Sequence, residues 1–302
     1  MRIGIFGGEV ARTGDLEATI AAAARAHDDG LASFWLPQIF GGDALTTLAI
    51  IGREVTGIEL GTAVVPTYPR HPLMLAAQAL TVQQAAGDRL ALGIGLSHQV
   101  VIESIYGMSY AKPVGHMKDY LSILRPLLHG EPVAYTGEHL SANGSISVPD
   151  AAPPPILVAA LGTQMLRLTG RHAEGTVTWM TGPTTLAEHI VPTINSAARE
   201  AGRGAPRIVA ALPVCVTDDP EGARALVAKE LAIYGELPSY RAMLDRERAA
   251  GPADVSIVGD EATVAAGIAK MEAAGVTDFV AVETARSDEH RQATRSLLTS
   301  LR

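Results

Sequence analysis

Short apolar runs alternate with amphipathic stretches along the chain, and this alternation predicts a repeating strand–helix order. The clearest example is Gly87–His98, in which a glycine and a charged turn precede the apolar run 90–94 and polar groups follow it. A short run that is apolar on both faces is typical of a buried parallel strand. Such a strand would bring Ser97 and His98 to its carboxyl end, where parallel α/β folds place their chemistry. An ordinary core strand that ends in a polar turn gives the same pattern.

The strand–helix pattern recurs eight times. We expect strands at residues 2–6, 32–36, 58–65, 90–94, 156–160, 175–180, 207–216 and 276–282. A helix is predicted after each strand, with Asp43, Asp260 and Ser287 as three of the N-terminal caps. Eight alternations fit a closed (β/α)8 TIM barrel better than an open doubly wound sheet, and no G-x-G-x-x-G follows the first strand. We therefore predict an α/β fold in which residues 1–302 form one TIM-barrel domain.

Two segments exceed the strand–helix repeat. In residues 130–155 the dipeptide Asn143-Gly144 predicts the turn of a β-hairpin. Residues 232–258 include a charged helix with no matching strand. Long loops on barrels often carry function, so we expect both insertions to cover the pocket and to select the substrate.

Charge and composition narrow the classes of function. The net charge of −8 and the lack of a long basic run argue against a nucleic-acid partner. No apolar run approaches the ~18 residues of a membrane span, and the N-terminus resembles a strand rather than a signal peptide. The single cysteine, Cys215, lies in an apolar run, where a small buried side chain fits better than a nucleophile. We expect a cytoplasmic protein with neither a nucleic-acid nor a membrane partner.

Several catalytic signatures are missing from the sequence. There is no H-E-x-x-H and the nine histidines are scattered, so no metal site is predicted. The absence of G-x-S-x-G and of G-x-x-x-x-G-K-[ST] disfavours acyl transfer and ATP hydrolysis. What remains is four predicted strand ends rich in small residues, at 61–64, 95–98, 159–163 and 179–182. Their glycines either form plain turns or let the backbone approach a ligand, and the helix start after Gly162 suits a phosphate.

The chain resembles the luciferase-like flavin oxidoreductase family through the combination GTAVVPTYPRHPLMLAAQALTVQQAAGDRLALGIGLSH. The family pattern is a G-T-x-V strand, an R-H-P helix start and a G-R-x-x-L-G-x-G strand, although this chain has Asp88-Arg89 where many members have Gly-Arg. Three later blocks are similar to the branch of the family that uses the deazaflavin coenzyme F420: PILVAALG, GTVTWMTGP and VGDEATVAAGIAKMEAAGVTDFV. The resemblance implies a homodimeric barrel that moves a hydride between C5 of F420 and a small organic substrate.

The resemblance also implies where the cofactor lies. The tricyclic ring would rest on a bulge after the third strand, with a cis peptide between Ala63 and Val64. The phosphate would lie near the loops after the fifth and sixth strands. The cofactor-binding residues expected on this basis are Thr62, Ala63, Val64, Ser97, Ala160, Leu161, Gly162, Thr163, Met180, Thr181 and Gly182.

In some F420-dependent relatives, an acidic residue after strand four and a charged or imidazole residue after strand two handle the substrate protons. This chain departs from that pattern. This chain has Ser97-His98 and Gln38 at these places. His98 is the best remaining acid or base because imidazole titrates near neutral pH, and a structural hydrogen-bonding role is its alternative. Gln38 cannot act as an acid and would orient the cofactor or substrate. For His71 a structural role is favoured over a cofactor contact, and Trp179 either lines the pocket or fills the core.

Two other functions remain open. An FMN-dependent luciferase-like monooxygenase, supplied by a separate flavin reductase, would share the fold. A non-catalytic flavin-binding protein would bind the cofactor without exchanging a hydride. Deazaflavins favour hydride transfer over oxygen chemistry, so F420-dependent oxidoreduction is our first hypothesis.

Overall fold

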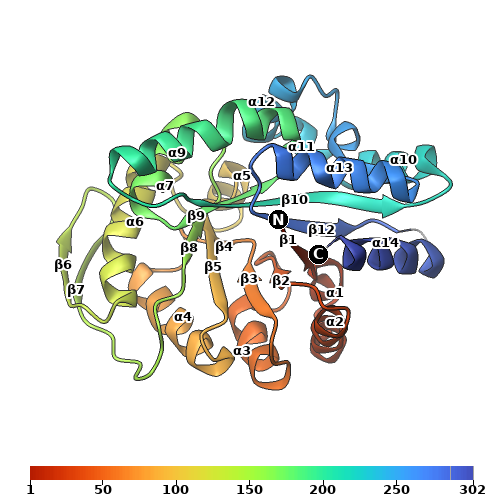
Figure 1. Cartoon of the computed structure of the whole chain (residues 1–302). Coiled ribbons are helices and arrows are strands. Elements are labelled where there is room, and N and C mark those ends of the chain that lie inside the picture. Colours follow the sequence, from red (N-terminus) through yellow and green to blue (C-terminus); the bar gives the residue numbers. More distant parts are fainter. Residues whose placement is uncertain (286, 302) are drawn as a thin grey trace.

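Eight parallel strands close into a ring in the part of the chain that the computed structural model describes, residues 1–285 and 287–301 (Figure 1). The ring closes where β1 pairs with β12, with Ile3 opposite Phe279. In order around the ring, the strands are β1 (Arg2–Phe6), β2 (Ser33–Leu36), β3 (Glu59–Thr62), β5 (Leu90–Gly95), β8 (Ile156–Val158), β9 (Gly175–Trp179), β10 (Arg207–Val216) and β12 (Asp278–Glu283). This is the predicted (β/α)8 TIM barrel, and its strands lie where the hydrophobic pattern predicts them.

Helices surround the ring and cover its outer face. The longer ones are α2 (Leu16–Asp28), α3 (Ala44–Glu54), α4 (Pro72–Ala86), α6 (Pro113–Leu128), α7 (Thr163–His172), α9 (Val191–Glu200), α10 (Pro220–Glu230), α13 (Glu261–Ala273) and α14 (Asp288–Ser300). Asp43, Asp260 and Ser287 cap three of them, because each side chain accepts a hydrogen bond from the backbone N–H three residues later. Gly87 ends α4 in the left-handed conformation, with φ of 61°.

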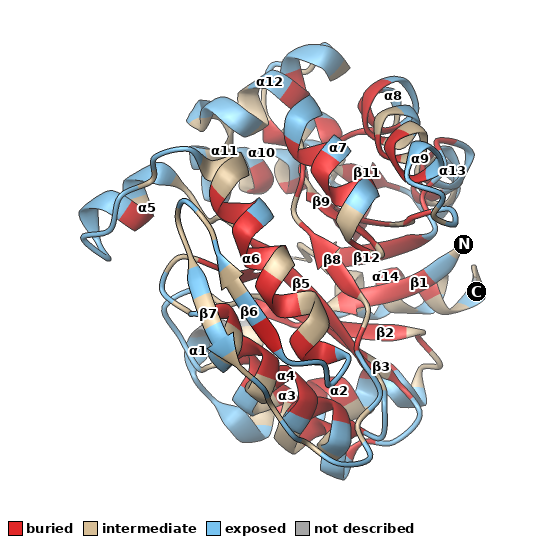
Figure 2. Ribbon diagram, turned by 90° about the vertical axis from the view of Figure 1, so that its left-hand side faces the viewer, coloured by how far each residue is buried: buried red, intermediate tan, exposed pale blue. Residues whose placement is uncertain are grey.

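The two larger parts of the core lie one outside and one inside the ring. The larger part lies between the strands and the helices, whose buried faces are drawn in red in Figure 2. The smaller part fills the barrel interior around Trp35, Leu157 and Val209. At the amino-terminal end of the barrel, Arg207 donates hydrogen bonds to Asp278 (2.9 Å from Nε) and to Glu59 (2.5 Å from Nη2). This ion-pair network closes that end, so ligands are expected at the opposite, carboxyl-terminal end.

Some short elements differ from the sequence predictions. The strand expected at 58–65 is divided into β3 and β4 (Val65–Pro66), because the chain bulges at Ala63–Val64. The strand expected at 156–160 ends at Val158. Neither α1 (Gly8–Thr13) nor β11 (Ile257–Gly259), which pairs with β10 outside the ring, was predicted. Both are too short to establish a hydrophobic period of their own.

The first insertion forms the expected hairpin, from β6 (Val133–Thr136) and β7 (Ser141–Gly144), but with a different turn. The prediction of a turn at Asn143-Gly144 is wrong, because Asn143 lies within the ladder opposite Ala134 and the chain reverses at 137–140. Asp119 of α6 explains this turn, since its carboxylate accepts hydrogen bonds from the N–H groups of His139 (2.7 Å) and Leu140 (3.3 Å). The hairpin lies on the outside of the barrel, against α6 (Figure 2).

The second insertion consists of two short helices and a 3-10 turn. These are α11 (Ile233–Glu236), α12 (Pro238–Glu247) and the turn Pro252–Val255. Helix α12 contacts α8 (Pro183–Thr185), which follows β9 and continues through the π-helical turn Leu186–Ile190 into α9. Within the described residues, none of the helices combines the length and the hydropathy needed to cross a bilayer.

Candidate functional site

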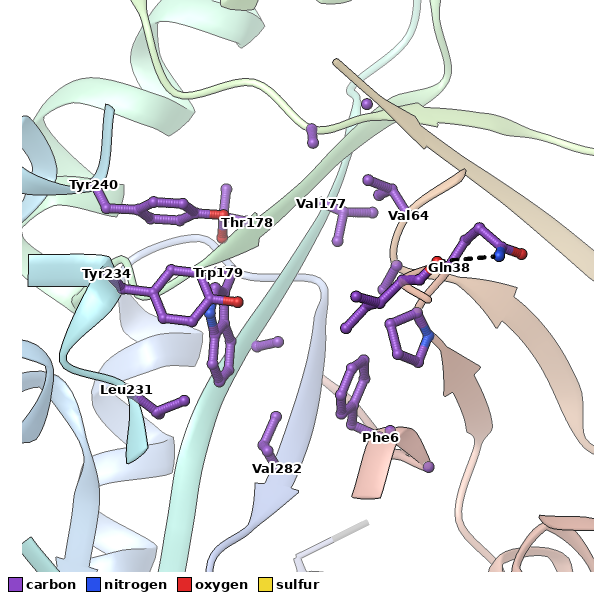
Figure 3. Close-up of a pocket in the computed structure, with 18 of the residues that line it drawn as sticks. Phe6, Gln38, Val64, Val177, Thr178, Trp179, Leu231, Tyr234, Tyr240 and Val282 are labelled. Atoms are coloured by element: carbon purple, nitrogen blue, oxygen red, sulfur yellow. Dashed lines mark hydrogen bonds between the residues drawn. The ribbon is translucent and has the colours of Figure 1, made fainter. Parts of the chain in front are cut away.

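A cavity of about 1520 Å³ lies at the carboxyl ends of the barrel strands (Figure 3). Its apolar floor includes Phe6, Val64, Val177 and Val282, each from a different part of the ring. Of the residues predicted for the site, those that line this cavity are Gln38, Ala63, Val64, Ser97, His98, Leu161, Gly162 and Thr163. Five others do not line it: Thr62, Ala160, Met180, Thr181 and Gly182.

The bulge after β3 depends on Thr62 and on the glycines of β5. The Thr62 hydroxyl donates to the Gly93 carbonyl oxygen (2.7 Å) and accepts from the Gly93 N–H (2.8 Å), so the side chain holds two strands together and does not reach the cavity. A Cβ atom at Gly93 would lie 1.9 Å from the Thr62 carbonyl oxygen, and one at Gly95 would lie 2.6 Å from Val64 Cγ2. The Ala63–Val64 peptide is cis, as the family resemblance implies. The G-x-G spacing of β5 therefore makes room for the bulge, which turns Val64 toward the cavity.

The first turn of α7 opens into the same cavity. Its N-cap, Gly162, has no side chain to cap the helix, and Thr163, Gln164 and Met165 of the first turn line the cavity. The N–H groups of a first turn have no partner within the helix, so such a turn can bind an anion. His189 orients the preceding loop, since its Nε2 lies 2.8 Å from the Leu161 carbonyl oxygen. This places a candidate phosphate site beside the bulge.

The second predicted phosphate position, after β9, is occupied by a carboxylate of the chain itself. Glu247 of α12 accepts hydrogen bonds from the N–H groups of Thr184 (3.1 Å) and Thr185 (2.7 Å) at the start of α8. Gly182 makes room for it, because a Cβ atom there would lie 2.4 Å from the Glu247 carboxyl carbon. The neighbouring Met180 and Thr181 are buried away from the cavity. A phosphate at this position would meet the Glu247 charge.

The two residues predicted to be catalytic, Gln38 and His98, both line the cavity, but only the Gln38 side chain is held by a hydrogen bond to the backbone. Gln38 Oε1 accepts a hydrogen bond from the Ala44 N–H (2.7 Å), which holds the side chain against the start of α3. His98 makes no capping hydrogen bond to α5 (Gln99–Ser104), and its ring lies 5.7 Å from that of Tyr240. Burial lowers the pKa of His98, so the imidazole is neutral near pH 7. It can therefore accept a proton or a hydrogen bond at the cavity wall.

Two ambiguous residues are placed by their contacts. His71 Nδ1 accepts from the Leu73 N–H (3.3 Å), and Nε2 lies 3.3 Å from the Ser141 carbonyl oxygen of the hairpin. Its structural role is thus confirmed, and it does not line the cavity. Trp179 does line the cavity while it packs on the barrel interior.

Two tyrosines that were not expected from the sequence, Tyr234 and Tyr240, line the cavity from α11 and α12 (Figure 3). A signal for them was present. Aromatic residues make up only 4% of the chain, yet two tyrosines lie within seven residues of an otherwise charged insertion. Aromatic side chains in such a segment indicate that it packs against another part of the protein, in addition to the packing that the strand–helix repeat predicts.

Known proteins resemble this chain in sequence and in fold. A 5,10-methylenetetrahydromethanopterin reductase of Methanolobus tindarius is 26% identical over 69% of this chain and 64% of its own length. A Mycobacterium tuberculosis protein, provisionally named a coenzyme F420-dependent oxidoreductase, is 29% identical over 70% of this chain and 66% of its own. The match thus spans slightly less than two thirds of each relative.

The fold is shared with a solved F420-dependent secondary alcohol dehydrogenase in complex with an F420–acetone adduct. The TM-score is 0.82 at 16% identity, and the match covers 100% of this chain and 99% of that one. The family model described as luciferase-like monooxygenase matches residues 1–285. The chain belongs to the luciferase-like monooxygenase family.

Proposed function

We propose that this chain is an F420-dependent oxidoreductase that moves a hydride between the deazaflavin C5 and a small organic substrate. The observation that carries the proposal is the uncapped first turn of α7, which opens into the cavity beside the apolar bulge at Val64. A flat ring with a phosphate-bearing side chain needs this combination of an apolar platform and an anion site. The name of the M. tuberculosis relative gives F420 as the cofactor and supports this choice.

The residues present fit such a cofactor. Gly93 and Gly95 give the bulge the room that turns Val64 toward the cavity, where Val64 would support the ring. The N–H groups of Thr163 and Gln164 would hold the phosphate. When bound, F420 supplies or accepts the hydride at its ring carbon C5. The chain itself excludes water with its apolar floor and holds a neutral imidazole, His98, at the wall for the accompanying proton.

FMN is the alternative cofactor, because the family description is that of a monooxygenase. Calorimetric titration separates the two. We expect F420 to bind more tightly than FMN, and a deazaflavin without the phosphate-bearing side chain to bind about tenfold more weakly than F420. Binding of FMN with no binding of F420 would contradict the proposal.

Gly162 offers a direct test of the phosphate site. A Cβ atom there meets nothing within 4 Å, so Gly162→Asp should fold normally, and its carboxylate would cap α7 in place of the phosphate. We expect the affinity for F420 to fall by about tenfold or more, from lost N–H donors and from charge repulsion. Gly162→Ala, which adds neither cap nor charge, is the matched control and should bind F420 like the original chain.

The family resemblance also supports a homodimer in the cytoplasm that acts on a small molecule. Sedimentation equilibrium at several protein concentrations tests the homodimer. A species of 31.5 kDa at all concentrations would contradict it.

A further inference from the structure

Tyr234 and Tyr240 form an aromatic edge along one side of the cavity. Their rings meet edge to face at 5.0 Å, Trp179 contacts Tyr234 at 5.8 Å, and His98 contacts Tyr240 at 5.7 Å. Figure 3 shows both phenol rings reaching from α11 and α12 toward the side of the cavity that holds Val64 and Gln38. The edge therefore faces the proposed position of the cofactor ring across open space.

The two hydroxyl groups have hydrogen atoms to donate. In the described part of the chain no group accepts the Tyr234 hydroxyl proton, because the indole N–H of the neighbouring Trp179 can only donate, so this proton is left for another partner. Among the described residues, none donates to or accepts from the Tyr240 hydroxyl. Burial raises the pKa of both phenols, so both remain protonated near neutral pH.

The surroundings of this edge are uncharged. Burial is the main cause of the pKa shifts of His98, Tyr234 and Tyr240, and no carboxylate or cation contributes to them. The charged side chains that line the cavity belong to α2 and its C-cap, α10, β12 and α14: Arg25, Asp29, Glu230, Glu283, Asp288, Arg291 and Arg295. An anionic substrate group at the aromatic edge would be buried with no cation beside it, which is unfavourable.

We propose that Tyr240, together with Tyr234, holds the oxygen atom of an uncharged substrate by donating hydrogen bonds to it. The substrate class is then a neutral carbonyl compound or alcohol, and this specifies the substrate of the proposed function above. The substrate oxygen lies at the aromatic edge, and the rest of the molecule lies over the apolar floor.

The position of Tyr240 depends on the contacts that hold α12 against α8, and we call these contacts the anchor of α12. Glu247 binds the start of α8, and the Thr185 hydroxyl donates to the Met243 carbonyl oxygen (3.2 Å). These contacts hold the helix that carries Tyr240 against the end of β9. The insertion thus positions a substrate group that the barrel strands do not supply.

The test uses four probes of one shape: cyclohexanone, cyclohexanol, methylcyclohexane and cyclohexanecarboxylate. Ligand-observed NMR titration measures their binding to the F420-loaded and to the cofactor-free protein, so no turnover is required. We expect the ketone and the alcohol to bind about fivefold to tenfold more tightly than methylcyclohexane, as one or two hydrogen bonds provide, and the carboxylate to bind most weakly. Tyr240→Phe should remove most of this preference and leave the affinity for methylcyclohexane unchanged.

Tyr135→Phe is the matched control, because Tyr135 lies on the hairpin, outside the cavity, and its hydroxyl donates to Asp119 of α6. It should keep the full preference for oxygen-bearing probes. A Tyr240→Phe protein that keeps the preference, tighter binding of the carboxylate, or no probe binding in either state would overturn the inference. Failure to bind F420 with normal probe binding would contradict the proposed function alone.

Discussion

The two insertions of this barrel are fixed by the same chemical device, yet only one of them contributes to the cavity. In the hairpin, Asp119 accepts the N–H groups of the turn, and Gly137 leaves room for the carboxylate. In the second insertion, Glu247 accepts the N–H groups at the start of α8, and Gly182 leaves room for it. The hairpin lies outside the barrel, whereas α11 and α12 bring Tyr234 and Tyr240 into the cavity.

The prediction that both insertions cover the pocket is therefore wrong for residues 130–155, none of which lines the cavity. The physical reason is the anchor. Asp119 lies on the outer helix α6, so the hairpin is held at the side of the barrel, while Glu247 holds α12 at the carboxyl end of β9. The length of an insertion does not show which face of a barrel it covers, because the anchoring partner decides this.

The largest expected effect is on stability at the hairpin anchor. Asp119 is 5% exposed, and Asp119→Ala would leave the Tyr135 hydroxyl and two backbone N–H groups without an acceptor. We expect the free energy of unfolding in urea to fall by about 3 kcal/mol, while F420 affinity is unchanged. A loss of F420 affinity at unchanged stability would reverse the roles assigned to the two insertions.

Acid should lower the free energy of unfolding through a histidine on the same helix, α6. His116 of α6 is buried against Tyr68, with ring centroids 4.0 Å apart, and burial lowers its pKa to about 4. Its stabilising neutral form is fully present above the unfolded pKa of about 6.5, and that stability is lost as pH falls toward 4, by up to about 3 kcal/mol. Urea unfolding at several pH values should show this slope, and His116→Gln should flatten it between pH 6.5 and 4. An equal slope in the variant would assign it to other groups.

Removing the Glu247 carboxylate, which holds α12 against α8, should lower stability less than Asp119→Ala does but should lower the affinity for the substrate probe. Glu247→Ala leaves two N–H groups at the start of α8 without an acceptor, which costs about 1 kcal/mol. Because Tyr240 is then less well positioned, the affinity for cyclohexanone should fall about fivefold in the NMR titration. Glu247→Gln keeps an oxygen acceptor and should lie between. Unchanged ketone affinity in Glu247→Ala would show that the anchor does not position Tyr240.

The sequence predicted the barrel well because each strand is a short apolar run between turn residues, and the cap residues such as Asp43 and Ser287 act locally. The contacts that decide the site are not local. Thr62 meets Gly93 across 31 positions, and Glu247 meets Thr185 across 62. No periodic pattern encodes such pairs. The family resemblance implied cofactor contacts for Thr62, Ala160, Met180, Thr181 and Gly182, which do not line the cavity, and no periodic pattern in the sequence indicated Tyr240, which does.

The most direct test of hydride transfer is the reduction of a carbonyl compound by reduced F420 in the absence of oxygen. The protein is mixed anaerobically with reduced F420 and a panel of uncharged ketones and aldehydes, and the absorbance of oxidised F420 is recorded together with the alcohol formed. We expect F420 to be oxidised in equal amount to the alcohol formed, at a rate that oxygen does not change. Product that appears only with reduced FMN and oxygen, and none with reduced F420, would contradict it.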